Sequence, residues 1–262
     1  MPFISSRGVS IHYEVEGDPA APPLMLHHGW TSDIESWRDF GYVRALEERF
    51  RLIMIDARGH GLSDVPENSD DYDPELFVAD VEAVLNAVGI ESVIFWGYSM
   101  GAAIGFQLAV STPGRIDRFI AGGMHPYGNS PGDDGARGPR PTKATSELRA
   151  GGMEGFIEAR ERDLGGRLVS KLRNRLLTFS ASGLASAGEA WAGWEGAGDH
   201  VADIKTPTLL YAGTGDTVFH DGASRAADEM PDARFVSLPG MSHDAGFASS
   251  RKALEAIGDF LG

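Results

Sequence analysis

Residues 93–105 read VIFWGYSMGAAIG. An apolar run typical of a buried strand enters the sequence GYSMG, and the small residues that follow are typical of a closely packed helix. Glycines flanking Ser99 allow the sharp strand-to-helix turn that holds a serine hydroxyl exposed at the end of a strand. The alternative is a serine that only ends a turn, and it would not require such strained geometry. The stretch therefore predicts an α/β fold with Ser99 as the candidate nucleophile.

The same rhythm of short apolar stretches and helical patterns extends over most of the chain. Strands are expected within VSIHYEVEG (9–17), LMLHHG (24–29), RLIMIDARGHG (51–61), ESVIFWG (91–97), IDRFIAGG (116–123), TPTLLYAGTGD (206–216) and ARFVSLPG (233–240). Helices are expected within 43–50, 73–89, 99–114, 167–179, 221–230 and 249–262. This alternation predicts a mostly parallel central sheet flanked by helices.

The alternation of expected strands and helices stops after residue 123 and resumes at residue 204. Between them lie a Gly- and Pro-rich loop, 125–143, and helical stretches without a strong strand. We therefore predict one core domain formed by residues 1–123 and 204–262, interrupted by a helical cap or lid over residues 124–203. Ligands of open α/β sheets bind beyond the carboxyl ends of the strands, and the insertion starts at such an end.

The composition limits the classes of partner. The chain has 23 Lys or Arg and 38 Asp or Glu, a net charge of −15, which argues against nucleic acid or an anionic membrane as a partner. It has no cysteine, which excludes disulfides, zinc–thiolate sites and thiol catalysis. The first 18 residues lack the apolar core of a signal peptide, and no run has the length of a membrane span. A cytoplasmic protein is the expectation; the sequence does not predict an oligomeric state.

A serine nucleophile needs a base, and the base needs an orienting acid. His243 directly follows the last expected strand on a glycine-bearing loop and is the best candidate base among the eight histidines. Asp216 ends the preceding strand and is the candidate acid; its alternative role is to cap the next helix. The chain order is then Ser, Asp, His. Of the other histidines, His12 is expected at the surface of an early strand, whereas His28 is structural or serves the oxyanion loop.

Acyl transfer also needs hydrogen-bond donors for the negative oxygen that develops on the substrate carbonyl. The backbone N–H of Met100, at the start of a helix, is one candidate, and that of Trp30 is the second. Trp30 either walls an acyl pocket or only packs, and the two roles are compatible. The candidate pocket residues are His28, Trp30, Trp191 and Trp194. Further cap residues line an apolar pocket or simply pack the lid against the core: Phe156, Leu168, Leu172 and Leu176.

Five motifs now resemble those of the α/β-hydrolase family: HGW (28–30), DARGHGLSD (56–64), GYSMG (97–101), GTGD (213–216) and GMSHD (240–244). The resemblance covers residues 1–122 and 204–262. It implies that Ser99, Asp216 and His243 form a catalytic triad, and that the amides of Trp30 and Met100 form the oxyanion hole. It also implies that Asp56 and Arg58 serve the structure of their loop, and that no metal or organic cofactor is required.

The resemblance also narrows the function. Haloalkane dehalogenases and epoxide hydrolases of this fold use a carboxylate where Ser99 stands, so acyl transfer is favoured. The first hypothesis is a carboxylic-ester hydrolase acting on small or medium acyl substrates, with a small-molecule ester or lactone as its partner. Perhydrolases (cofactor-free haloperoxidases), carbon–carbon bond hydrolases and acyltransferases use the same triad and remain alternatives. A hydrolase-fold ligand receptor is the alternative of another class.

Overall fold

The structure is a computed structural model that describes residues 2–128 and 139–262. Residues 129–138, in the middle of the loop expected over 125–143, lie outside the described residues. Among the described residues, no helix is both long and apolar enough to cross a membrane.

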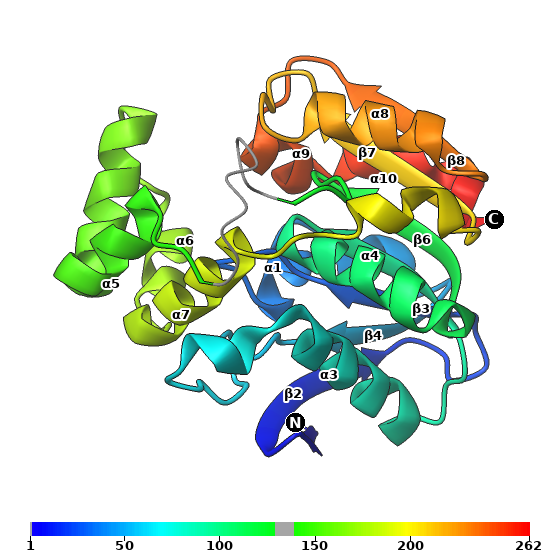
Figure 1. The fold of residues 1–262 in the computed structure, drawn as a ribbon, viewed down its shortest axis with the longest axis horizontal. Helices are drawn as coiled ribbons and strands as arrows, with labels where there is room; N and C mark the ends of the chain where they lie inside the picture. Colours follow the sequence, from blue (N-terminus) through cyan, green and yellow to red (C-terminus); the bar gives the residue numbers. More distant parts are fainter. Residues whose placement is uncertain (1, 129–138) are drawn as a thin grey trace.

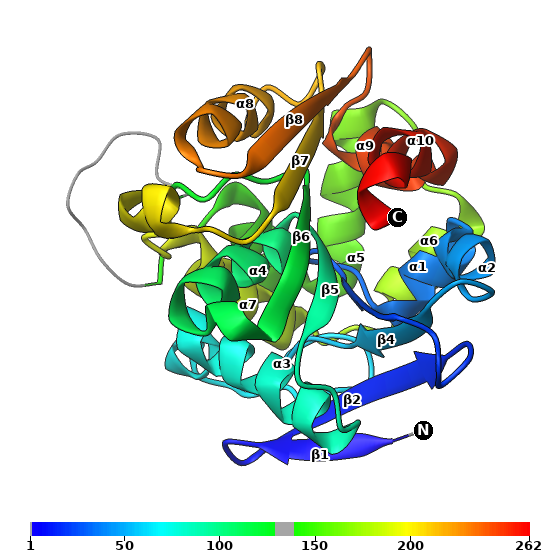
Figure 2. The same ribbon diagram turned by 90° about the vertical axis from the view of Figure 1, so that its right-hand side faces the viewer.

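A single sheet runs through the molecule in the strand order β1-β2-β4-β3-β5-β6-β7-β8 (Figure 2). The two pairings of β2 are antiparallel, and every pairing from β4 to β8 is parallel. The strands are β1 (Phe3–Ser6), β2 (Val9–Glu16), β3 (Pro23–His27), β4 (Arg51–Ile55), β5 (Val93–Tyr98), β6 (Ile116–Gly122), β7 (Thr208–Gly213) and β8 (Ala233–Leu238). The predicted mostly parallel sheet is therefore confirmed, and β1 is added to it.

Helices cover both faces of this sheet (Figure 2). One apolar cluster joins α3, α4 and α8 to the first face, and a second joins α1, α2, α9 and α10 to the other. These helices are α1 (Ile34–Asp39), α2 (Tyr42–Leu46), α3 (Pro74–Ala87), α4 (Met100–Ser111), α8 (His220–Glu229), α9 (His243–Ala248) and α10 (Ser250–Leu261). Short 3₁₀ helices occupy Ser69–Tyr72 (η1), Pro113–Arg115 (η2) and Gly198–Asp203 (η3). The central strands are buried on both faces, which explains their continuous apolar sequences.

Between β6 and β7 the described chain forms helices instead of strands. They are α5 (Lys143–Leu164), α6 (Ser170–Leu176), α7 (Ala181–Ala192) and the 3₁₀ helix η3. In Figure 1, α5, α6 and α7 lie at the left, outside the layers of the core. The three share an apolar cluster of their own, against whose edge Trp30 of the core packs. The division into a core domain and a cap over residues 124–203 stays a prediction.

The prediction that His12 lies at the surface is wrong. Its side chain is 2% exposed, and its Nδ1 lies 2.7 Å from Asp56 Oδ2. Asp56 also accepts the backbone N–H groups of Ile34 and Leu62, at 2.9 and 3.0 Å. Burial alone would raise the pKa of Asp56, but the hydrogen bond from His12 and the two backbone donors hold it below its usual value. Asp56 therefore organises the loop after β4, which buries the outer face of β2 at His12.

Arg58 belongs to the same loop and is almost fully buried. Its guanidinium forms two hydrogen bonds of 2.7 Å to the carboxylate of Asp80 in α3, whose side chain is also buried. A further guanidinium N–H donates to the carbonyl of Asp71 at 2.6 Å. Such a bidentate pair leaves neither buried charge unpaired. Like Asp56, Arg58 fixes the loop and lies outside the candidate site.

Candidate active site

Ser99 occupies the sharp turn between β5 and α4. Its backbone has φ 53° and ψ −119°, a conformation that costs a non-glycine residue about 1–3 kcal/mol. A Cβ at Gly97 would collide with the backbone of Gly101, and a Cβ at Gly101 would collide with the carbonyl oxygen of His27. The strand, the turn and the helix therefore pack so closely that both glycines of GYSMG are needed. The predicted strained elbow is confirmed as a backbone geometry.

His243 lies next to the Ser99 hydroxyl. Its Nε2 is 3.0 Å from Ser99 Oγ, and its Nδ1 is 2.7 Å from Asp216 Oδ2. Because a carboxylate only accepts hydrogen bonds, Nδ1 carries the ring proton and Nε2 is left to accept the serine proton. His243 was expected on a loop, but it is the first residue of α9, whose N-cap is Ser242. The structure thus brings the three predicted residues together in one hydrogen-bonded series.

Asp216 contacts His243 and also the turn before α8, although α8 itself has Phe219 as its N-cap and no side-chain cap. It lies in the loop between β7 and α8, and its side chain is 3% exposed. While Oδ2 contacts His243, Oδ1 accepts the backbone N–H of Phe219 at 3.2 Å, just before α8 begins. The turn into α8 therefore fixes the orientation of the carboxylate that faces the imidazole.

Tyr98 is a supporting residue that the sequence did not single out. Its hydroxyl donates to the backbone carbonyl of His243 at 2.5 Å, and its ring lies 5.3 Å from the imidazole. Burial raises the pKa of Tyr98 well above its usual value, so the hydroxyl stays a donor. Phe219 contacts the imidazole as well, at 5.0 Å between ring centroids. Tyr98, the residue before Ser99 in the GYSMG turn, therefore helps to hold His243.

The loop of His28, Gly29 and Trp30 lies directly against the elbow. A Cβ at Gly29 would be 3.2 Å from Ser99 Cβ. His28 Nδ1 donates to the Gly29 carbonyl at 2.8 Å, and its Nε2 accepts the Ala57 N–H at 3.0 Å. A ring nitrogen that accepts a hydrogen bond requires a neutral imidazole, and burial lowers the pKa of His28 to about 4. His28 is thus a buried brace of the loop that bears the Trp30 amide.

Three buried histidines give the fold a predictable response to acid. Burial lowers the pKa values of His27 and His28 to about 4 and that of His60 to about 3. In the unfolded chain these rings bind protons at about pH 6.5, so acidification below that value favours unfolding. We expect the free energy of unfolding, from urea titrations, to fall steadily between about pH 6.5 and pH 4. A free energy of unfolding that does not change over this pH range would contradict the prediction. The control is His200→Gln, at an exposed histidine, which should show the same fall as the native chain.

A cavity of about 610 Å³ opens in front of Ser99. Of the candidate pocket residues, Trp30 and Trp191 line it, as do Leu168, Leu172 and Leu176. Aromatic residues that the sequence did not suggest complete the wall, because distant segments of the chain supply them: Phe40, Tyr98, Phe219 and Phe247. A volume of this size is in the range that binds small organic ligands.

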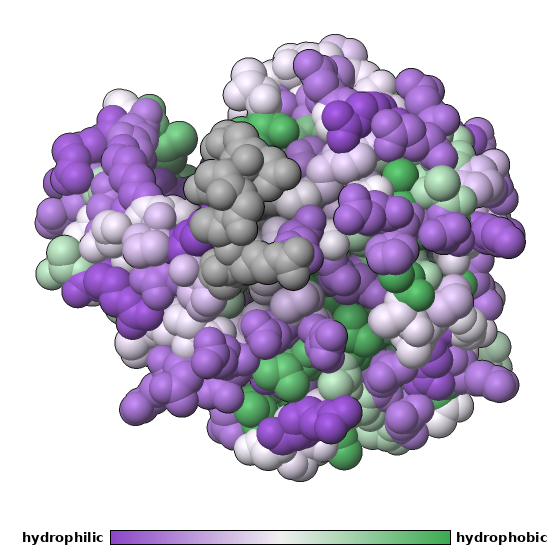
Figure 3. Space-filling view, in the orientation of Figure 1, coloured by the Kyte–Doolittle hydropathy of each residue, from purple (hydrophilic) through white to green (hydrophobic). Residues whose placement is uncertain are grey.

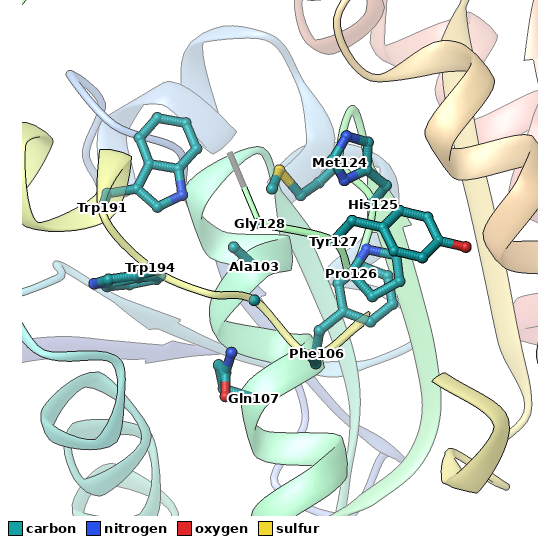
Figure 4. A pocket seen from close by; sticks show the side chains of 12 residues that line it. Ala103, Phe106, Gln107, Met124, His125, Pro126, Tyr127, Gly128, Trp191 and Trp194 are labelled. Carbon is teal, nitrogen blue, oxygen red and sulfur yellow. The ribbon is translucent and has the colours of Figure 1, made fainter. Parts of the chain in front are cut away.

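Two of the candidate pocket residues, His28 and Trp194, do not line this cavity. His28 is fully buried beneath the loop, and the indole N–H of Trp194 donates to the Tyr72 carbonyl at 3.2 Å. Trp194 instead borders a separate gap of about 10 Å³, shown in Figure 4. That gap has room for one water at most. Phe156, likewise absent from the cavity wall, packs edge-on against Trp30 at 6.0 Å between ring centroids.

Trp30 links the core to the helices between β6 and β7. Its indole N–H donates to the Leu184 carbonyl in α7 at 2.9 Å. The ring packs so closely on Gly188 of the same helix that a Cβ there would lie 2.7 Å from it. One residue therefore borders the cavity and ties the loop beside Ser99 to α7.

The comparisons with known proteins agree with this architecture. The family model described as alpha/beta hydrolase fold matches residues 22–199. A non-heme chloroperoxidase of Streptomyces lividans is 27% identical over 91% of both chains. The enol-lactonase of Burkholderia xenovorans LB400 is 25% identical, covers 99% of both chains and superposes with a TM-score of 0.83. An esterase of Rhodococcus sp. ECU1013, also 25% identical, covers 99% of this chain and 97% of its own, with a TM-score of 0.80.

Proposed function

Because the chain belongs to the alpha/beta hydrolase family, we propose that it cleaves carboxylic esters, lactones included, through an acyl-enzyme on Ser99. The observation that carries the proposal is the hydrogen-bonded series from Ser99 through His243 to Asp216, at 3.0 and 2.7 Å, in which Ser99 and His243 line the cavity. The esterase and enol-lactonase among the similar structures support the choice of an ester or a cyclic ester as substrate.

The first chemical step is acylation. Ser99 Oγ attacks the ester carbonyl carbon while His243 Nε2 takes its proton. Asp216 holds the imidazole in the required tautomer and stabilises the imidazolium that forms. We assign the negative oxygen of the tetrahedral intermediate to the backbone N–H groups of Trp30 and Met100, the latter at the N-terminus of α4. His243 then protonates the leaving alcohol.

The second step is deacylation. Water enters the site, His243 takes its proton, and the hydroxide attacks the acyl carbon bonded to Ser99 Oγ. The tetrahedral intermediate collapses to the free acid, and the proton returns to Ser99. This chain's own side chains supply every proton transfer in both steps.

The helices between β6 and β7 form the cap of this site in our proposal. Leu168, Leu172 and Leu176 line the cavity from the side of α6 and the turn before it. Trp30 fixes α7 to the loop that bears one proposed oxyanion donor. The cap therefore shapes the space for the substrate and leaves the chemistry to the core.

The similarity to a non-heme chloroperoxidase favours one second candidate. In perhydrolysis, hydrogen peroxide replaces water as the nucleophile on the acyl-enzyme and releases a peracid. The same triad serves both reactions, so the two differ only in the second nucleophile that the site admits. Peracid formation from an ester and peroxide, compared with hydrolysis of that ester, separates them.

The direct test of ester hydrolysis is p-nitrophenolate release from p-nitrophenyl acyl esters of increasing chain length; hydrolysis of butyrolactone and caprolactone is followed in parallel by the acid that is released. We expect turnover with at least one ester class and a rate maximum at the chain length that fills the cavity. Absence of turnover with every ester and lactone would contradict the proposal.

A further inference from the structure

Side chains of both charges line the cavity in front of Ser99. The cations belong to the helices between β6 and β7, and the carboxylates belong to the core: Arg160 in α5, Lys171 and Arg175 in α6, Asp39 in α1 and Asp244 in α9. In Figure 3 the lobe that Figure 1 labels α5 and α6 has a largely hydrophilic outer surface. Basic groups of these helices therefore meet acidic groups of the core on the cavity wall.

Asp39 pairs with two of these cations. Its Oδ1 lies 2.5 Å from Lys171 Nζ, and its Oδ2 contacts Arg175 Nη2. Burial alone would raise the pKa of Asp39, but Lys171 and Arg175 hold it below its usual value. Asp39 is therefore ionised at neutral pH and occupies both cations.

Arg175 has a second carboxylate, Asp33, which lies behind the wall. Arg175 Nη1 is 3.5 Å from Asp33 Oδ1, and it donates to Ser36 Oγ at 3.2 Å. Burial raises the pKa of Asp33 to about 6, although Arg175 opposes this shift, so Asp33 carries most of its charge at neutral pH. The side chains of Arg175 and Asp39 are only 13% and 18% exposed, so water screens this cluster weakly.

The remaining pair joins Arg160 to Asp244, the residue after His243. Arg160 Nη2 donates to Asp244 Oδ2 at 2.6 Å. Each Asp, Lys and Arg side chain on the described wall thus has a partner of opposite charge. Three cations are balanced by three carboxylates: Arg160, Lys171 and Arg175 by Asp33, Asp39 and Asp244.

Aliphatic and aromatic side chains form much of the rest of the wall: Phe40, Leu168, Leu172, Leu176, Phe219 and Phe247. An ionic group that entered this cavity would give up part of its hydration, and burial of a charge without a partner is costly. To gain a partner, a substrate carboxylate would have to displace Asp39 or Asp244 from cations that they already contact. The wall therefore favours substrates without a charge.

We propose that Asp39 and Asp244 are specificity-determining residues, which neutralise the cations of the cavity wall and thereby make uncharged esters and lactones the preferred substrates. Neither carboxylate takes part in the reaction; each acts by occupying a cation that would otherwise attract an anionic substrate. This substrate class rests on the proposed ester hydrolysis, and it deepens that proposal.

The probes are p-nitrophenyl hexanoate and the mono-p-nitrophenyl ester of adipic acid, which share a six-carbon acyl chain and differ in the terminal carboxylate. At neutral pH we expect kcat/KM of the native chain to be larger for the hexanoate ester by about tenfold or more. NaCl at about 0.5 M screens the repulsion from the net charge of −15, and the preference should persist there. A preference that vanishes at this salt concentration, or a native preference for the adipate ester, would overturn the proposal.

Asp39→Asn leaves Lys171 without its carboxylate, and Asp244→Asn does the same to Arg160. Each variant should raise the adipate-to-hexanoate ratio of kcat/KM by about fivefold. Asp221→Asn, at an exposed carboxylate outside the cavity wall, removes the same single charge and should keep the native ratio. A ratio that stays native in both Asp39→Asn and Asp244→Asn would overturn the proposal.

Arg160→Gln is the reciprocal variant, and it decides the question if the two asparagine variants do not fold. It leaves Asp244 unpaired on the wall, so the adipate-to-hexanoate ratio should fall below the native value. An unchanged or increased ratio would contradict the role of Asp244. Because the ratio compares two substrates in one protein, a loss of activity common to both esters cancels.

A binding measurement keeps this result separate from the proposed reaction. If the native chain turns over neither ester, ester hydrolysis fails as the function, but titration calorimetry with methyl hexanoate and monomethyl adipate still decides the inference. Tighter binding of methyl hexanoate, with a smaller difference in Asp39→Asn but not in Asp221→Asn, supports the neutral wall. Equal binding of the two esters, tighter binding of monomethyl adipate, or a difference that Asp39→Asn leaves unchanged overturns it.

Discussion

Replacing Ser99 by alanine is expected to lower kcat/KM for p-nitrophenyl esters by about 10⁴- to 10⁶-fold. The variant removes Ser99 Oγ, the atom that attacks the ester carbonyl in the acylation step, and leaves His243 without a serine proton to accept. Alanine retains a Cβ, so the backbone strain at φ 53° is the same as in the native turn and folding should be unchanged. The measurement is p-nitrophenolate release at a high concentration of the variant, so that slow residual turnover can be detected.

Ser111→Ala is the matched control for this variant. Ser111 lies at the other end of α4, where its hydroxyl donates to the carbonyl of Gln107 at 2.8 Å. It should retain native activity, because it lies far along the helix from the elbow. Near-native hydrolysis by the Ser99→Ala protein would show that another group attacks the ester.

The second large effect is expected for Asp216→Asn, about 10⁴-fold in kcat. The asparagine carbonyl still accepts the N–H of Phe219, which directs the amide NH₂ toward His243 Nδ1. A donor in that position forces the ring proton onto Nε2, so the imidazole presents a donor to Ser99 and no longer accepts its proton. The geometry survives while the tautomer is wrong, so KM should change far less than kcat.

Asp221→Asn is the matched control for this substitution. Asp221 lies five residues further along the chain and is fully exposed, and among the described residues its polar contact is with His220, at 2.8 Å. Native kinetics are expected for it. If Asp216→Asn also kept its activity, Asp216 would be only the cap of the turn before α8, and a different acid would have to orient His243.

Ser99 and Asp216 could be predicted from the sequence because each follows the end of a strand. The apolar run before Ser99, its two glycines and the small residues of α4 leave one compatible local geometry, and that geometry was found. Asp216 follows β7 in the same way. The parallel sheet then brings these strand ends to one edge, where the residues meet although they are 117 positions apart in the chain.

The surroundings of the site were harder to predict from the sequence, because they depend on contacts between distant segments of the chain. His12 alternates in β2 like an outward-facing residue, but the loop after β4 covers it with Asp56. Trp194 has the spacing of a pocket residue and yet turns toward Tyr72. Phe247, on the cavity wall, comes from the short helix α9, which has no periodic pattern long enough to detect.

Covalent labelling of the intact chain tests the central claim, that Ser99 is an activated nucleophile, most directly. A fluorophosphonate reacts with a serine only where a base removes its proton, so the reaction needs no knowledge of the natural substrate. By intact-mass and peptide mass spectrometry the account predicts one adduct per chain, on Ser99, formed far more slowly in Asp216→Asn. Absence of an adduct, or an adduct on another residue with Ser99 unmodified, would contradict it.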